Sequence, residues 1–470
     1  MRSLGFLRPL GQTWAALALV VCLIALATLL TESWLAARAF FITAGMLGFA
    51  GGLIWSASAG VKIVARAAEA SAYVMALWFL TPLFLILPFV LLTPGMSYFE
   101  ALFESYSAFT TTGAILLSPE NVPDTVIFWR CLLSFLGGYL TLMTAAAILA
   151  AFDKTGLDLR KSTLLTVSKE NIFSNLHVAA RRIALIYCGL TAIGFLFLLA
   201  TNVPAFEALC LAFSAISTGG YTVSSGALAG QVNGFAIAIL AGISLIGATN
   251  IAYLRTLITE RDKLLDAEPL AMLATIIGLT LLFYLGTSGG AAIHHVLADA
   301  IFVVSTTGFT VSNSAGHVPL AAVLAAMVGG AVASTAGGLK ISRLVILSRS
   351  ALAELARMAH PSGIVSVKYR GRTTENPAML ALWSTVLGYI GLVAIGVVFL
   401  ALSGEPFEAA WSAAATAIAN AGPLHDQLSP DHSWANLSPV SLGFTVLLMV
   451  LGRLEVLAGL AAIAAIIRRF

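Results

Sequence analysis

Long apolar runs divide the sequence, and they limit the possible folds more than any other feature does. A helix of about 20 apolar residues crosses about 30 Å of hydrocarbon, because each residue adds about 1.5 Å. Ten runs of roughly this length are present, at residues 13–31, 39–55, 72–94, 126–151, 182–201, 233–258, 270–286, 319–351, 378–402 and 440–467. We therefore predict an all-α polytopic membrane protein.

Composition supports this class and excludes a soluble domain. The 470 residues are 59% hydrophobic and 10% charged, and the mean hydropathy is +0.96. A soluble globule of this size has too little interior to hide that surface. The first run follows Arg2 and Arg8, but a second run comes almost at once, so we predict a retained helix rather than a cleaved signal. The four cysteines show no CxxC spacing and predict neither a disulfide framework nor a zinc site.

Charge is distributed unevenly between the connections. Lys and Arg gather in segments 153–182, 255–268 and 340–375, so the positive-inside rule places these segments and both termini in the cytoplasm. The opposite connections, 95–124, 202–231, 287–318 and 404–438, contain carboxylates and no Lys or Arg. Such a face favours the approach of cations. The positive-inside bias alone also explains the pattern, so both interpretations stay open.

The four outer connections share one internal order. Each begins with a stretch of short-helix length: "YFEALFESYSAF", "AFEALCLAFSAI", "HHVLADAIFVVS" and "PFEAAWSAAATAIA". A polar, glycine-containing loop follows each: "TTTGA", "STGGY", "TTGFT" and "NAGP". Aligning Gly113, Gly219, Gly308 and Gly422 predicts a unit of span, short helix, loop and span, repeated four times after an N-terminal helix pair.

This order predicts five segments along the chain. They are the helix pair (1–70) and four repeats at 71–152, 153–268, 269–358 and 359–470.

Non-helical backbone at membrane depth is tolerated only where protein or a watery cavity satisfies its carbonyl groups. A dehydrated alkali cation is a suitable partner for such oxygens, and glycine lets the backbone point them inward. A single Thr-Thr-Gly is more typical of helix packing, but four in matching positions favour an ion site. The predicted filter residues are Thr111, Thr112, Gly113, Thr218, Gly219, Gly220, Thr307, Gly308, Phe309, Asn420, Ala421 and Gly422.

Two further features lie within the spans. A glycine cluster interrupts the eighth run and predicts a broken segment at 329–340, suited to a gate; helix packing is the alternative. Arg453 and Glu455 fall inside the last run, where a charge is costly, so Arg453 is expected to face the pore or pair with Glu455. The gate candidates are Gly329, Gly330, Ser334, Thr335, Gly337, Gly338, Lys340 and Arg453.

Other chemistry has little support. His294, His295 and Asp299 suggest metal ligation only weakly, because His295 and Asp299 alone stand four apart. No nucleophile with a base and no HExxH motif is present, so we predict no catalytic residues and no enzyme. No partner nucleic acid is expected.

The four loop motifs, with "ASTAGGLKISR" at 333–343 and "LGRLE" at 451–455, resemble those of the Trk/Ktr/HKT potassium transporter superfamily. The extra N-terminal helix pair resembles the arrangement in the Trk-type transmembrane subunit of this superfamily. The resemblance implies a pseudo-fourfold pore in the bacterial inner membrane, a homodimer and a cytosolic RCK-type nucleotide-binding subunit. It also makes segment 329–338 and Arg453 the gate and barrier. The expected K⁺ ligands are Thr112, Gly113, Thr218, Gly219, Thr307, Gly308, Asn420 and Gly422.

Two departures from the family pattern are visible. "GGYLTL" at 137–142 replaces a glycine-rich start, and His425 and Asp426 follow Pro423 where glycines are usual. This pair at the pore mouth is a candidate source of pH sensitivity or altered selectivity.

The sequence favours potassium uptake driven by the membrane potential, at about 2.3 kcal/mol per charge per 100 mV. Alternatives are a Na⁺- or H⁺-coupled symporter with broken helices and a less selective monovalent cation channel.

Overall fold

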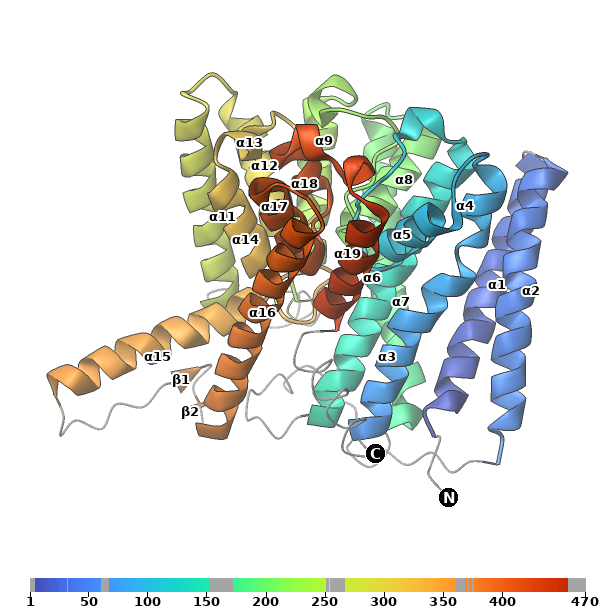
Figure 1. Ribbon diagram of the computed structural model, residues 1–470, viewed down its shortest axis with the longest axis horizontal. Coiled ribbons are helices and arrows are strands. Elements are labelled where there is room, and N and C mark those ends of the chain that lie inside the picture. The colour runs from blue at the N-terminus through green and yellow to red at the C-terminus, as the bar shows by residue number, and fades with distance from the viewer. Residues whose placement is uncertain are drawn as a thin grey trace.

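The computed structural model describes residues 5–31, 33–60, 67–152, 172–250, 253, 267–360, 368–369, 372–373 and 376–454. These residues form a bundle of helices (Figure 1), in which seven helices are long and apolar enough to cross a membrane. The predicted helical membrane class is confirmed. Within the described ranges, strand pairing is limited to β1 (Lys368–Tyr369) and β2 (Arg372–Thr373), an antiparallel ribbon that the sequence did not predict.

The chain begins with a helix pair, α1 (Leu7–Thr31) and α2 (Trp34–Ala57), which stands at one edge of the bundle in Figure 1. The Ser33 side chain caps α2 by accepting a hydrogen bond from the Ala36 N–H. The two helices pack closely: a Cβ on Gly51 would lie 2.8 Å from Ala15 N and 2.9 Å from Gly11 O. Small residues at the crossing allow this approach, as is usual between helices in lipid.

A second group of helices surrounds the first of the four short helices. It consists of α3 (Ala67–Phe84), α4 (Leu87–Leu92), α5 (Tyr98–Phe109), η1 (Pro119–Asn121) and α6 (Asp124–Phe152). A capping box starts α5, since the Ser97 side chain accepts from Glu100 N and the Glu100 carboxylate accepts from Ser97 N.

Three further groups follow along the chain. The first is α7 (Ile172–Ala200), α8 (Ala205–Ser217), η3 (Leu228–Gly230) and α9 (Gly234–Ala248). The second is α11 (Ala267–Gly286), α12 (Ile293–Val304), α13 (Ser314–His317), α14 (Pro319–Val328) and α15 (Ile341–Ala359), whose far end extends away from the bundle in Figure 1. The third is α16 (Asn376–Leu402), α17 (Phe407–Ala419), α18 (Pro423–Leu428), η5 (Pro430–His432), η6 (Trp434–Asn436) and α19 (Pro439–Arg453).

The predicted spans differ from the helices at two places. The sixth run, 233–258, was expected to be one helix, but α9 ends at Ala248 because Thr249 adopts an extended conformation. The eighth run, 319–351, is broken as its glycines predict: α14 stops at Val328 and α15 starts at Ile341. Gly329 has a φ of +68°, which a helix cannot accommodate.

Three apolar helices, α6, α9 and α19, pack on short helices through a glycine. A Cβ on Gly137 of α6 would overlap the Phe109 carbonyl oxygen, and one on Gly452 of α19 would overlap that of Ile418. On α9, a Cβ at Gly247 would lie 2.5 Å from Ile216 O. These glycines bring the last turns of α5, α8 and α17 against α6, α9 and α19, and so fix where the following loops lie.

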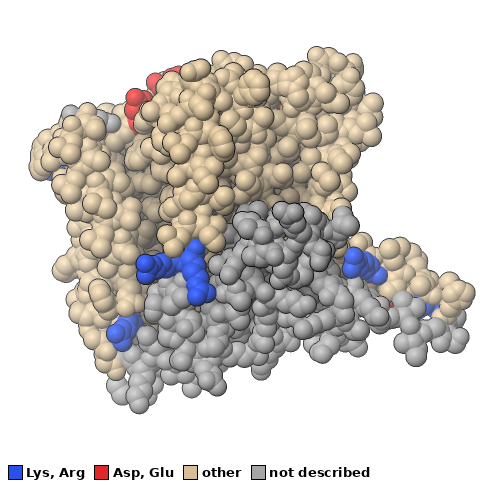
Figure 2. All heavy atoms as spheres, turned by 180° about the vertical axis from the view of Figure 1, so that it is seen from behind, with Lys and Arg blue, Asp and Glu red and all other residues tan. Residues whose placement is uncertain are grey.

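The two ends of the bundle differ in charge. On the face seen in Figure 2, Asp and Glu gather at the upper end, and Lys and Arg lie near the lower end of the described part. In Figure 1 the short helices α5, α8, α12 and α17 lie in the upper half of the bundle.

The glycine contact predicts a position-specific stability effect on α9. Gly247→Ala is expected to lower the stability of the detergent-solubilised protein by about 1–3 kcal/mol, because the methyl group overpacks against Ile216 O. Gly242→Ala on the same helix is the matched control, since nothing lies within 4 Å of its Cβ position. Thermal unfolding followed by size-exclusion chromatography measures both. Equal melting temperatures for the two variants would contradict the packing role.

Candidate functional site

The four short helices end with the same turn. Thr111, Thr218, Thr306 and Asn420 all have left-handed backbone, with φ between 51° and 59°. Each N–H donates to the carbonyl three residues back, at Ala108, Ala215, Val303 and Ala417. Threonine rarely adopts this conformation, so its threefold use indicates that the surroundings enforce it. We call the segments loop 1 (110–114), loop 2 (217–221), loop 3 (306–310) and loop 4 (420–423).

Backbone conformation changes one alignment. The residue two positions after the left-handed one is Gly113 in loop 1, Gly220 in loop 2 and Gly308 in loop 3, with φ of 79°, 72° and 73°. Gly220, rather than Gly219, is therefore the conformational equivalent of Gly113. Gly422 holds this position in loop 4, but its φ is −56°.

The four loops contact one another in a closed circuit. A Cβ on Gly113 would overlap Gly219 O of loop 2, and one on Gly220 would overlap Thr307 O of loop 3. A Cβ on Gly308 would lie 3.2 Å from Pro423 of loop 4. Loop 4 closes the circuit, because Gly422 N donates to Thr112 O of loop 1 at 2.6 Å. The loops therefore meet around a common centre, and their residues in these contacts are buried or half-buried.

Hydroxyl groups brace loops 1 and 3 in the same way. The Thr110 and Thr112 hydroxyls are 2.7 Å apart, and those of Ser305 and Thr307 are 2.9 Å apart. The Asn420 amide links loop 4 to loop 1 by donating to Thr112 Oγ1 at 3.0 Å.

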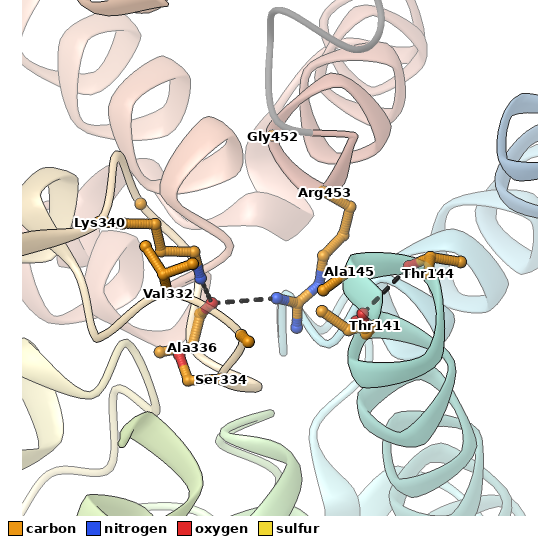
Figure 3. A pocket seen from close by; sticks show the side chains of 12 residues that line it. Thr141, Thr144, Ala145, Val332, Ser334, Ala336, Lys340, Gly452 and Arg453 are labelled. Carbon is orange, nitrogen blue, oxygen red and sulfur yellow. Dashed lines mark hydrogen bonds between the residues drawn. The ribbon is translucent and has the colours of Figure 1, made fainter. Parts of the chain in front are cut away.

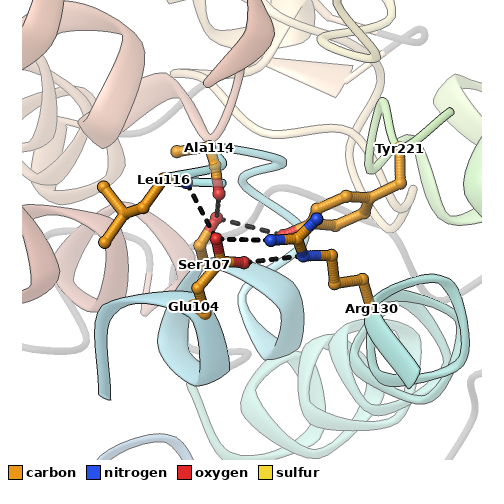
Figure 4. Close-up of polar contacts among 6 residues, drawn as sticks. All are labelled: Glu104, Ser107, Ala114, Leu116, Arg130 and Tyr221. Atoms are coloured by element: carbon orange, nitrogen blue, oxygen red, sulfur yellow. Dashed lines mark hydrogen bonds and ion pairs between the residues drawn. The ribbon is translucent and has the colours of Figure 1, made fainter. Parts of the chain in front are cut away.

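A buried ion pair supports loop 1 (Figure 4). Arg130 of α6 donates two hydrogen bonds to Glu104 of α5, from Nη2 to Oε1 at 2.7 Å and from Nε to Oε2 at 2.9 Å. Glu104 Oε1 also accepts from Leu116 N at 2.8 Å, and the Ser107 hydroxyl donates to Ala114 O at 2.7 Å. The pair, at most 2% exposed, ties the middle of α5 to the backbone after loop 1.

The buried carboxylate of Asp299 supports the backbone after loop 3, as Glu104 does after loop 1. The Asp299 carboxylate accepts from the N–H groups of Val311, Ser312 and Ser314 and from the Ser312 hydroxyl. This explains its burial without a metal, and the part of the chain described here contains no group of three His, Cys, Asp or Glu side chains suited to a metal ion. Sequence reasoning missed this role, although Glu104 and Asp299 both stand nine residues before a loop glycine.

The segment after loop 4 packs over the loops. His425 is fully buried and its Nδ1 lies 2.8 Å from the Ser412 hydroxyl. The Asp426 carboxylate accepts from Trp434 N at 3.1 Å. Burial lowers the pKa of His425 to about 4 and raises the pKa of Asp426 to about 7. Asp426 is thus the member of the pair that titrates near neutral pH.

Segment 329–340 contacts the bases of loops 2, 3 and 4. The Thr335 hydroxyl donates to Ile216 O at 2.9 Å, and Gly337 N donates to Thr306 Oγ1 at 2.8 Å. A Cβ on Gly337 would overlap Ala419 O. Thr306 is a contact that sequence reasoning missed, because it selected Thr307 instead.

Arg453 joins loop 1 to the same segment, and Figure 3 shows its side chain beside Ala336. Its Nε donates to Thr110 O at 2.7 Å, and Nη1 donates to Thr335 O at 2.7 Å and Ala336 O at 3.4 Å. Lys340 also donates to Ala336 O through Nζ. Glu455, the alternative partner considered for Arg453, lies outside the described residues.

A cavity of about 40 Å³ lies beside these two cationic side chains. Figure 3 shows Arg453 and Lys340 approaching it from different segments. Its lining includes Thr141 and Thr144 of α6, Gly452 and Arg453 of α19, and the predicted gate residues Ser334, Gly337, Gly338 and Lys340. This volume accommodates on the order of three water molecules. Gly329, Gly330 and Thr335, the remaining predicted gate residues, lie in the same broken segment without lining the cavity.

Breaking the buried Glu104–Arg130 pair should cost much more stability than breaking an exposed ion pair. Glu104→Gln should destabilise the protein by about 3–5 kcal/mol, because it leaves the Arg130 guanidinium buried beside a neutral amide. Glu354→Gln, in the exposed Glu354–Arg357 pair, is the control and should change stability by less than about 1 kcal/mol. Thermal unfolding in detergent compares them. Similar losses in both variants would rule out the bracing role.

Comparison with known proteins identifies the family. The family model TrkH, described as a cation transport protein, matches residues 37–268 and 289–468. The Trk system potassium uptake protein TrkH of Salmonella typhimurium is 26% identical over 437 residues, covering 90% of both chains. TrkI of Halomonas elongata, another Trk system potassium uptake protein, is 28% identical over 466 residues, covering 96% of this chain and 94% of its own.

A solved structure has the same fold. The crystal structure of the potassium transporter TrkH from Vibrio parahaemolyticus superposes with a TM-score of 0.86 and 23% identity, covering 98% of each chain. Because the family model covers most of the sequence, the chain belongs to the TrkH family of cation transport proteins and is a membrane transporter, not an enzyme.

Proposed function

We propose that this protein takes up potassium through a single pore whose selectivity filter is built from loops 1 to 4. The observation that carries the proposal is the closed circuit of buried loops, each entered through the same left-handed turn. Relatives across nearly the whole chain are named potassium uptake proteins, which supports K⁺ as the transported ion.

In this filter, backbone carbonyls replace the water around a dehydrated cation. Oxygens of Gly219 and Thr307 are candidates, because each occupies the position just before the glycine of its loop. Thr112 O holds the same position in loop 1 and shares its lone pairs with the Gly422 N–H, at 2.6 Å. Short helices whose C-terminal ends carry partial negative charge point at the same region and add to the attraction. The filter list from the sequence stands as proposed, with Gly220 as the loop 2 glycine and Thr306 added.

We assign the gate to segment 329–340. Its contacts with loops 2, 3 and 4, and its link to loop 1 through Arg453, suit an element that lies below the filter and moves to open it. The guanidinium of Arg453 then opposes a cation leaving the filter inward. The hydrogen bonds of Arg453 to Thr110 O and Thr335 O hold its charge at this place.

The cellular arrangement is also a proposal. The polarity of charge in Figure 2 suits a protein of the bacterial inner membrane, surrounded by lipid, with both termini in the cytoplasm. A homodimer and a cytosolic RCK-type nucleotide-binding subunit are the partners expected from the family. Coupling of uptake to H⁺ or Na⁺ is the second candidate, favoured by the broken segment between α14 and α15.

The filter assignment predicts altered ion preference in a glycine variant. Gly308→Ala should reduce the preference for Rb⁺ over Na⁺ by about tenfold, because Cβ strains a left-handed position and crowds Pro423. Gly226→Ala is matched for backbone strain, since its φ is +96°, but has nothing within 4 Å of its Cβ position. Competitive uptake into potassium-starved cells measures both variants. The same ion preference in Gly308→Ala and the wild type would contradict the assignment.

The barrier role predicts a gain of flux on removing charge at position 453. Arg453→Gln should raise the maximal rate of Rb⁺ uptake several-fold, because the cation below the filter is lost. Arg453→Lys keeps the charge and should stay close to wild type in rate. Uptake per amount of membrane-inserted protein is the measurement. If Arg453→Gln and Arg453→Lys lower the uptake rate equally, Arg453 has a structural role and is not a barrier to the ion.

A further inference from the structure

Two side chains that follow loop 4 donate hydrogen bonds to loop carbonyls. The Gln427 amide Nε2 donates to Gly308 O of loop 3 at 2.6 Å, and the Trp434 indole Nε1 donates to Gly422 O at 2.9 Å. Gly308 and Gly422 occupy the same position in their loops, two residues after the left-handed one. Both donors come from 423–434, so one segment bonds a carbonyl of loop 3 and a carbonyl of loop 4. Gly422 O also accepts from His425 N at 3.0 Å, whereas Gln427 is the donor to Gly308 O.

The segment is held firmly in this position. Leu424 and Trp434 are fully buried, and the Trp434 ring lies 5.8 Å from that of Phe103 and 4.5 Å from that of His425. The bond from Trp434 N to Asp426 fixes the backbone that carries the indole. The two donors are therefore preorganised and lose little freedom on bonding.

Pro423 adds a steric element at the same place. A Cβ on any of Gly113, Gly220 or Gly308 would come within 2.6–3.2 Å of the Pro423 ring. One proline thus lies beside the glycines of three other loops. The residues after it turn into the short helix α18, which carries Gln427 over loop 3.

We propose that Gln427 and Trp434 determine the cation affinity of this filter by withdrawing the Gly308 and Gly422 carbonyls from the ion. The inference rests on the proposed filter. A carbonyl oxygen that already accepts a short hydrogen bond offers less negative potential to a cation. Two of the four oxygens at this position in the loop sequences are engaged, so an ion position that they line is weak. Weak binding favours rapid release into the next position.

The test replaces the donors and measures uptake kinetics. Gln427→Met keeps the side-chain length without a donor and should lower the half-saturating Rb⁺ concentration about two- to tenfold, the factor that one hydrogen bond represents. The maximal rate should not rise, since tighter binding slows release. Trp434→Phe removes the indole donor and should act in the same direction but less strongly, because Gly422 O still accepts from His425 N. It carries the test if Gln427→Met does not reach the membrane.

Gln231→Met is the matched control. Gln231 is an outer-loop glutamine whose Nε2 donates to the carbonyls of Ser224, Ser225 and Gly226, outside the four loops. The half-saturating Rb⁺ concentration of Gln231→Met should equal that of the wild type.

The outcomes distinguish the inference about Gln427 and Trp434 from the filter assignment on which it rests. Lower half-saturation in Gln427→Met or Trp434→Phe, but not in Gln231→Met, supports the inference. If both donor variants keep the wild-type half-saturating Rb⁺ concentration while Gly308→Ala alters the ion preference, the inference is overturned and the filter assignment stands. No effect of any of these substitutions overturns the filter together with the inference.

Discussion

The structure depends on one constraint: buried backbone carbonyls need partners where no bulk water reaches them. Four short helices stop inside the bundle, each at a residue with left-handed backbone. Three of these residues are threonines, for which the conformation is strained. Such strain persists only where the surroundings fix it, and it is concentrated at functional sites. The strained turns send the following carbonyls toward neighbouring loops instead of along a helix.

The surroundings that fix the turns are themselves polar and buried. Glu104 with Arg130 behind loop 1, and Asp299 behind loop 3, use carboxylates to hold the N–H groups that follow each loop. From below, Arg453 reaches both Thr110 O and Thr335 O, so the position of the broken segment is linked to that of loop 1. A movement of segment 329–340 must therefore break contacts with the loops above it. This linkage is a physical basis for the proposed coupling between gate and filter.

Much of the fold follows from the sequence. Apolar runs predict the membrane class, and glycines predict the break between Val328 and Ile341 because they disfavour a continuous helix. The four loop motifs identify the segments that meet at the centre. Backbone conformation is harder to predict from the sequence. The motif "STGGY" contains two glycines, and only the φ values distinguish Gly220 from Gly219. The partners of Glu104, Asp299 and Gln427 depend on tertiary packing, which the order of residues alone does not specify.

The most direct measurement of the central claim is the position of the cation. Crystals of the protein grown in Rb⁺ allow anomalous diffraction to locate the ion independently of any transport assay. We predict an anomalous peak at the meeting point of loops 1 to 4, within about 3 Å of the carbonyl oxygens of Gly219 and Thr307. Rubidium bound elsewhere, with no peak among the four loops, would contradict it.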